Sequence, residues 1–168
     1  MTALVVCDSG GLVAVDATVR RICGAFERFF AAGARGAPWF KAAYALYYRY
    51  IVLPSPAAAE QRSRIIAAGY ESAEVLRQAW HNFGQPEADI RAELRGLTVP
   101  VWFAWARHDR VIPLSFCRPA IDAAQRGSLT TFDAGHATFL EQPDAFAEGF
   151  LAFAKDHAVT PFRLRPAA

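Results

Sequence analysis

Polar residues that could take part in catalysis follow three short apolar runs of the sequence, at 3–7, 99–106 and 129–132. The side chains concerned are Asp8, Ser9, His108, Asp109, Asp133 and His136. In an open α/β sheet, ligands bind outside the carboxyl ends of the strands, so residues that follow strands can converge on one site. There a carboxylate can hold one imidazole nitrogen while the other nitrogen takes a proton from a nucleophile or from water. Asp109 and His136 are therefore the candidate orienting acid and general base.

A metal site is a second interpretation of the same residues. His108, Asp109, Asp133 and His136 are all of the types that bind metal ions. Nothing in the sequence, however, marks the outer hydrogen-bonding partners that metal ligands need. We therefore expect neither a metal ion nor a cofactor.

Helical periodicity fills the stretches between the three apolar runs. Asp16 can cap a helix that extends to about residue 32, with Gly33 and Gly36 as its stop signals. Further helices are predicted over 39–53, 57–68, 72–83, 85–94, 114–124 and 143–157, with Ser55 and Ser72 as candidate caps. The apolar runs have the length of buried strands. Buried strands that alternate with helices predict an α/β fold with a parallel sheet.

The layout predicts four parts. These are a core strand with its exit loop at 1–15, a helical insertion at 16–96, the remaining core at 97–158 and a tail without periodicity at 159–168. The inner face of the last helix would consist of Phe146, Phe150, Leu151 and Phe153. Only three strands are recognisable, whereas a stable sheet of this type usually has about five or six. We therefore expect a partial fold.

The composition narrows the class of partners. The chain is 54% hydrophobic and carries a net charge of only +2, which favours a globular protein and does not predict nucleic acid or an anionic membrane as a partner. No apolar run reaches the ~18 residues that a membrane helix needs. Cys7, Cys23 and Cys117 form no disulfide framework or metal-binding spacing, which indicates a reducing compartment. We expect a cytoplasmic protein.

Two segments resemble the C-terminal half of the α/β-hydrolase family. PVWFAWARHDRVIP is similar to the family's strand and G/A-x-x-D-x-x-x-P loop, with Asp109 in the acid position. DAGHATFLEQPDAF is similar to its G-H-x-x-x-x-E-x-P motif, with His136, Glu141 and Pro143 in register. The resemblance covers about residues 2–156. It implies an α/β-hydrolase fold with a helical cap after the first strand.

The resemblance also implies that part of the active site lies elsewhere. The family carries its nucleophile in a G-x-S-x-G elbow, or the aspartate equivalent, ahead of the cap, and the sequence contains no clean match. It therefore implies a hydrolase whose nucleophile is not in this chain, with His136 as base and Asp109 as the acid. Chemistry of the haloalkane dehalogenase or epoxide hydrolase type, with an aspartate nucleophile, stays open. So does a catalytically inactive fragment, or a binding module that self-associates or is completed by a missing N-terminal half.

The stretch CDSGGLV contains the tetrapeptide found around the nucleophile of trypsin-like serine proteases. That fold needs its histidine and aspartate ahead of the serine, and only eight residues precede Ser9. Ser9 or Asp8 could instead be the nucleophile of a hydrolase. The residue two positions before a nucleophile must be small, however, and Cys7 and Val6 stand there. Asp8 is the better of these two minor candidates, and the stretch is predicted to end the strand before the cap.

The helical insertion is rich in large aromatic residues. They are Trp39, Phe40, Tyr44, Tyr47, Tyr48, Trp80 and Phe83. Helical aromatics usually belong to a core, but a face turned toward the catalytic residues would line an apolar pocket. We therefore expect the substrate to be a small to medium hydrophobic ester or related compound.

Overall fold

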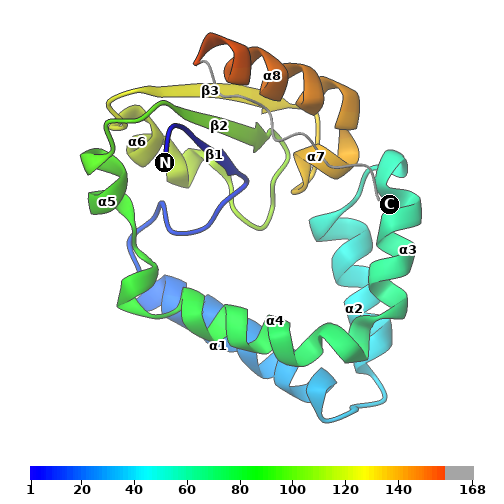
Figure 1. Ribbon diagram of the computed structural model, residues 1–168. Helices are drawn as coiled ribbons and strands as arrows, with labels where there is room; N and C mark the ends of the chain where they lie inside the picture. Colours follow the sequence, from blue (N-terminus) through cyan, green and yellow to red (C-terminus); the bar gives the residue numbers. More distant parts are fainter. Residues whose placement is uncertain (158–168) are drawn as a thin grey trace, which may run out of the picture.

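A three-stranded parallel sheet forms the centre of the computed structural model, which describes residues 1–157 (Figure 1). The strands are β1 (Leu4–Cys7), β2 (Val101–Ala106) and β3 (Gly127–Phe132), in the order β1-β2-β3. Leu4 lies opposite Val101, which lies opposite Gly127, so the strands run in register and end at the same side. The predicted α/β fold with parallel strands is confirmed.

β2 is the middle strand of the sheet, and all six of its residues are buried. Trp105 packs on one face of the sheet with α6 (Leu114–Asp122), and Trp102 packs on the other with α8 (Pro143–Asp156). Both indole N–H groups are satisfied: Trp102 donates to Oγ1 of Thr130 at 2.9 Å, and Trp105 donates to the carbonyl of Ile112 at 3.0 Å. This matters because a buried donor without a partner would cost ~1–3 kcal/mol.

The residues between β1 and β2 form a long helical excursion, here called the helical arm (17–96). Its elements are α1 (Ala17–Ala34), α2 (Phe40–Tyr47), the π-helical turn η1 (Tyr48–Val52), η2 (Pro56–Ala58), α3 (Ala59–Ala67), α4 (Gly69–Phe83), η3 (Pro86–Ala88) and α5 (Arg91–Gly96). α1 packs along α4, and in Figure 1 this pair lies across from the sheet. α2, η1 and α3 stand beside α7 (Thr138–Glu141), at the end to which the strand arrows point.

Asp16 begins α1 as predicted, because its Oδ1 accepts the N–H groups of Thr18 and Val19 at 2.8 and 2.9 Å. Of the two predicted stop signals, Gly36 is confirmed: it follows the helix with a left-handed φ of 75°, and its N–H donates to the carbonyl of Gly33 at 2.8 Å. The predicted stop at Gly33 itself is wrong. The helix continues to Ala34, and Gly33 serves as a point of close packing: a Cβ there would lie 2.5 Å from the ring of Phe40. Its conformational freedom is not what selects glycine at this position.

Other predicted helices also differ from the structure. The helix predicted at 85–94 is divided between η3 and α5, with Asp89 and Ile90 outside both. The helix predicted at 39–53 is divided between α2 and the turn η1. The helix predicted from Ser72 begins at Gly69, where a Cβ would lie 2.8 Å from the ring of Tyr44. The hydroxyl of Ser72 donates to the carbonyl of Ala68 within the first turn and does not act as a cap. Ser55 does cap η2, since its Oγ accepts the N–H of Ala57 at 3.2 Å.

The inner face of α8 is only half as predicted. Phe146 and Phe153 pack against the sheet, but Phe150 and Leu151 are 38% and 57% exposed. Gly149 explains the difference, because a Cβ there would lie 2.8 Å from Trp102. Positions 146, 149 and 153 share one helical face, so the close approach at Gly149 turns Phe150 and Leu151 outward.

The tail predicted at 159–168 lies outside the described residues. Within 1–157, none of the helices combines the length and the apolar character that crossing a bilayer requires.

Candidate active site

Asp109 lies in the loop that follows β2, and its side chain is fully buried. Its Oδ1 accepts the N–H groups of Val111 and Ile112 at 2.7 and 2.8 Å, which closes a tight turn around the carboxylate. Oδ2 then faces Nδ1 of His136 at 2.9 Å. One oxygen therefore fixes the loop, and the other is available to the histidine.

His136 lies in the loop that follows β3 and is 23% exposed. Because a carboxylate only accepts hydrogen bonds, Nδ1 carries the proton in the bond to Asp109. In the neutral ring Nε2 is then the unprotonated nitrogen, and within residues 1–157 it has no hydrogen-bond partner. This is the arrangement of a base and its orienting acid: Nε2 can accept a proton, and the carboxylate stabilises the resulting imidazolium.

Asp8 directly follows β1 and is a second buried carboxylate, 6% exposed and with a left-handed φ of 41°. Its Oδ1 accepts the N–H of Ala106 at 2.6 Å, and its Oδ2 accepts the N–H of Thr138 at 3.2 Å. Burial raises the pKa of Asp8 to about 6 and the charge of Asp109 adds to this, while the two backbone N–H groups and His136 lower it. Asp8 thus joins the ends of β1 and β2 to the histidine loop.

The remaining polar residues at the strand ends do not join this pair. The hydroxyl of Ser9 donates to the carbonyl of Gly10 at 3.1 Å. His108 pairs with Asp133 at 2.8 Å, and both side chains are mostly exposed. The four residues of the metal interpretation thus separate into two pairs, and residues 1–157 contain no cluster of three metal-ligating side chains.

The histidine motif predicts the position of Glu141 but not its role in the site. Its side chain is 1% exposed. Oε1 accepts three consecutive backbone N–H groups, those of Gly135, His136 and Ala137, at 2.9, 2.9 and 3.1 Å. The carboxylate therefore holds the turn from which the imidazole projects.

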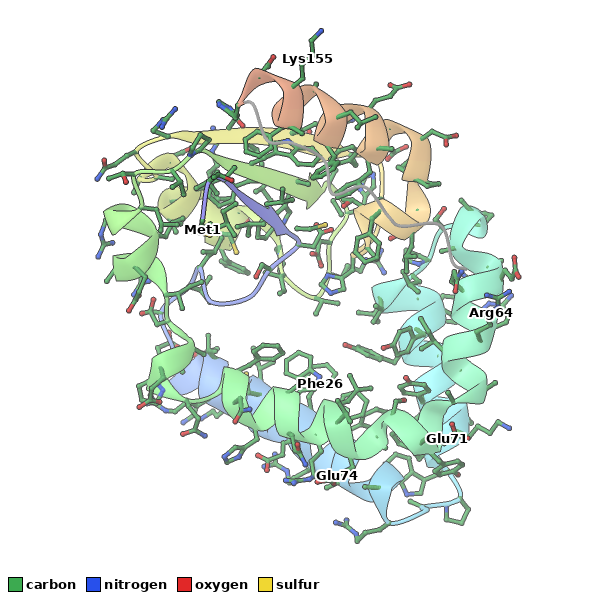
Figure 2. The ribbon with its side chains drawn as sticks, viewed as in Figure 1. Met1, Phe26, Arg64, Glu71, Glu74 and Lys155 are labelled. Carbon is green, nitrogen blue, oxygen red and sulfur yellow. The ribbon has the colours of Figure 1, made fainter. Side chains whose placement is uncertain are left out.

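The helical arm presents aromatic side chains toward the same region. Tyr47 packs against the cluster of buried residues that includes Ala137, next to His136, and burial, with smaller effects from Tyr44 and the charge of Asp109, raises the pKa of its phenol. Beside it an apolar groove of about 210 Å³ is lined by Ala25, Phe26, Phe29, Ala43 and Tyr47. Figure 2 shows Phe26 on the side of the α1–α4 pair that faces the sheet.

Of the comparisons with known proteins, the one with solved structures supports the fold. Neither the protein-family models nor the curated proteins include a match. Among solved structures, an alpha/beta hydrolase from a Medee basin deep-sea metagenome library has a TM-score of 0.67 at 14% identity, over 99% of this chain and 59% of its own. An esterase from Exiguobacterium antarcticum has a TM-score of 0.71 at 15% identity, over 92% of this chain and 57% of its own. MenH from S. aureus has a TM-score of 0.71 at 13% identity, over 94% of this chain and 60% of its own.

These similarities are too low in sequence identity to transfer an activity, and the chain spans less than two thirds of each of these structures. They do agree with the parallel sheet and with the resemblance of its two loops to one family. The chain therefore has the α/β-hydrolase fold over the 57–60% of these structures that it covers.

Proposed function

We propose that this chain supplies the acid and the base of a hydrolase active site, with His136 as general base and Asp109 as the acid that orients it. The observation that carries the proposal is the 2.9 Å contact between Nδ1 of His136 and Oδ2 of Asp109, with Nε2 turned away from the acid. General-base catalysis of this kind contributes roughly 10²–10⁴ to a rate. In this proposal the helical arm is the cap of the hydrolase.

The nucleophile in this proposal comes from a segment that pairs with β1. The N–H groups of Leu4 and Asp8 donate to Pro100 and Ala104 on the β2 side. Since peptide groups alternate along a strand, those of Val5 and Cys7 point to the other edge. Within residues 1–157 no strand occupies that edge. A parallel strand added there would end on the same side as β1 and β2, where Asp109 and His136 lie.

The groove beside Tyr47 supports the substrate class that we propose. Its lining residues are apolar except for the phenol hydroxyl of Tyr47, whose ring lies 5.3 Å from that of Phe26. An apolar wall with one hydroxyl favours an uncharged hydrophobic molecule. We propose a small to medium hydrophobic ester.

The test compares this 168-residue chain with a product extended in frame upstream of the Met1 codon, using p-nitrophenyl acetate and butyrate. The chain alone is expected to show no turnover, and the extended product is expected to hydrolyse both esters. In the extended product, His136→Ala should lower kcat at least about 100-fold. His81→Ala is the matched control, because His81 is an exposed helical histidine that pairs with Glu27. Full activity in His136→Ala would overturn the role of His136.

A second candidate function is a binding or assembly module without catalysis, and the open edge of β1 favours it. An unpaired apolar strand is a template for another strand. Size-exclusion chromatography with light scattering tests whether the chain assembles through this edge. Concentration-dependent association would support assembly through the edge, whereas a monomer with cooperative melting would argue against it.

A further inference from the structure

Glu141 contacts two parts of the chain that are far apart in sequence. Oε1 accepts the three N–H groups of the histidine loop, as described above. Oε2 lies 3.3 Å from the backbone N of Ser55, which belongs to the helical arm 86 residues earlier. Within residues 1–157 this buried carboxylate has no ion pair, so backbone N–H groups alone satisfy it.

The segment at Ser55 is itself firmly held. Nη1 of Arg62 donates to the carbonyls of Leu53 and Ser55 at 2.5 and 3.0 Å. Pro54 lies against Gly135, so closely that a Cβ on Gly135 would overlap the proline ring. The arm and the histidine loop are therefore in van der Waals contact at the same place where they share the carboxylate.

We infer that Glu141 is a positioning residue that couples the position of the helical arm to the orientation of His136. A displacement of the arm at Ser55 pulls on Oε2, and the same carboxylate fixes the N–H of His136 through Oε1. The catalytic consequence of this coupling rests on the proposed function. The coupling itself is a property of the fold and is measured without turnover.

Two substitutions at one position isolate the arm's half of the contact. Ser55 has φ −62°, the value at which proline is fixed, and Ser55→Pro replaces the N–H that points to Oε2 with the ring Cδ, which cannot donate and pushes against the carboxylate. The same substitution also removes the hydroxyl that caps η2. Ser55→Ala removes that hydroxyl and keeps the N–H, so it is the matched control. Glu141→Gln removes one acceptor of the carboxylate directly.

The readouts are the ¹H and ¹⁵N signals of the His136 imidazole and the hydrogen exchange of the Gly135 and Ala137 amides. Ser55→Ala is expected to leave the ring signals in place. Ser55→Pro is expected to shift or broaden them and to speed amide exchange about tenfold, the effect of losing ~1.4 kcal/mol of local stability. Glu141→Gln should act in the same direction and more strongly, because its own contacts to the loop are impaired.

Identical ring signals and exchange rates in Ser55→Pro and Ser55→Ala would overturn the coupling. If Glu141→Gln does not fold, the Ser55 pair still decides, since both variants leave the Glu141 side chain itself unchanged. Failure of the proposed function would leave this result unchanged, because an inactive protein with a displaced His136 ring in Ser55→Pro still shows the coupling. Full ester hydrolysis by Ser55→Pro, with His136 ring signals unchanged from those of Ser55→Ala, would refute the coupling and leave the proposed function standing.

Discussion

Nδ1 of His136 lies 2.9 Å from Oδ2 of Asp109, although 27 residues separate the two in the chain. The contact forms because β2 and β3 are adjacent and parallel, so the loops that follow them leave the sheet on the same side. The turn closed by Oδ1 of Asp109 then aims the other carboxylate oxygen at the ring. Both loops must be in place for Nε2 to be the unprotonated nitrogen.

The tautomer of His136 should therefore depend on Asp109. In Asp109→Asn, the amide can donate as well as accept, so the ring loses its preference for a proton on Nδ1. Ring ¹⁵N spectra should change from one tautomer to a mixture. Asp133→Asn is the control, since Asp133 pairs with the exposed His108. Unchanged His136 spectra in Asp109→Asn would show that the acid does not set the tautomer.

Asp8 should make the stability of the fold depend on pH. Burial raises its pKa from 3.8 to about 6, so the folded state favours the protonated form. Its contribution is fully present below about pH 4 and is lost as pH rises through 6, by ~3 kcal/mol for a shift of about two units. Asp8→Asn does not titrate. Urea unfolding from pH 4 to 7.5 should therefore show a smaller decline in Asp8→Asn, and parallel curves for the two proteins would contradict this.

The three cysteines should react slowly in the folded protein. Burial raises the pKa of Cys7 to about 11 and that of Cys117 to about 12, and it also raises that of Cys23. Since the thiolate is the reactive form, labelling by Ellman's reagent at pH 8 should be about 100-fold slower than in 8 M urea. All three thiols should become fast in urea. A rapidly labelled native thiol would indicate that its site opens to solvent.

Gly135 should tolerate no side chain. A Cβ there would overlap Pro54 and lie 3.2 Å from Oε1 of Glu141, so Gly135→Ala must displace the arm or the histidine loop. We expect a loss of ~1–3 kcal/mol in the free energy of unfolding, measured by urea denaturation. Gly96→Ala is the control, because a Cβ at Gly96 meets no atom within 4 Å. Equal free energies of unfolding for the two variants would mean that Pro54 can move to make room for a Cβ at position 135 at little cost.

Local signals in the sequence predicted much of the framework. Strand-length apolar runs identified β1, β2 and β3, and Asp16 marked the start of α1 because capping is decided within three residues. The same signals placed a helix end at Gly33 and a helix start at Ser72, although both residues lie inside helices. Glycine is required at positions 33 and 69 by tertiary packing against Phe40 and Tyr44, and no local pattern reports such packing.

The sequence by itself determined which residues stand at the strand ends, and its two motifs singled out Asp109 and His136 as the acid and the base. Only the tertiary structure decided that Nδ1 of His136 is the nitrogen that faces the carboxylate. It alone also gave Glu141 its two contacts, with the histidine loop and with Ser55. The reason is physical: a hydrogen bond depends on distance and direction within a few tenths of an ångström, which only the packing of the whole chain sets.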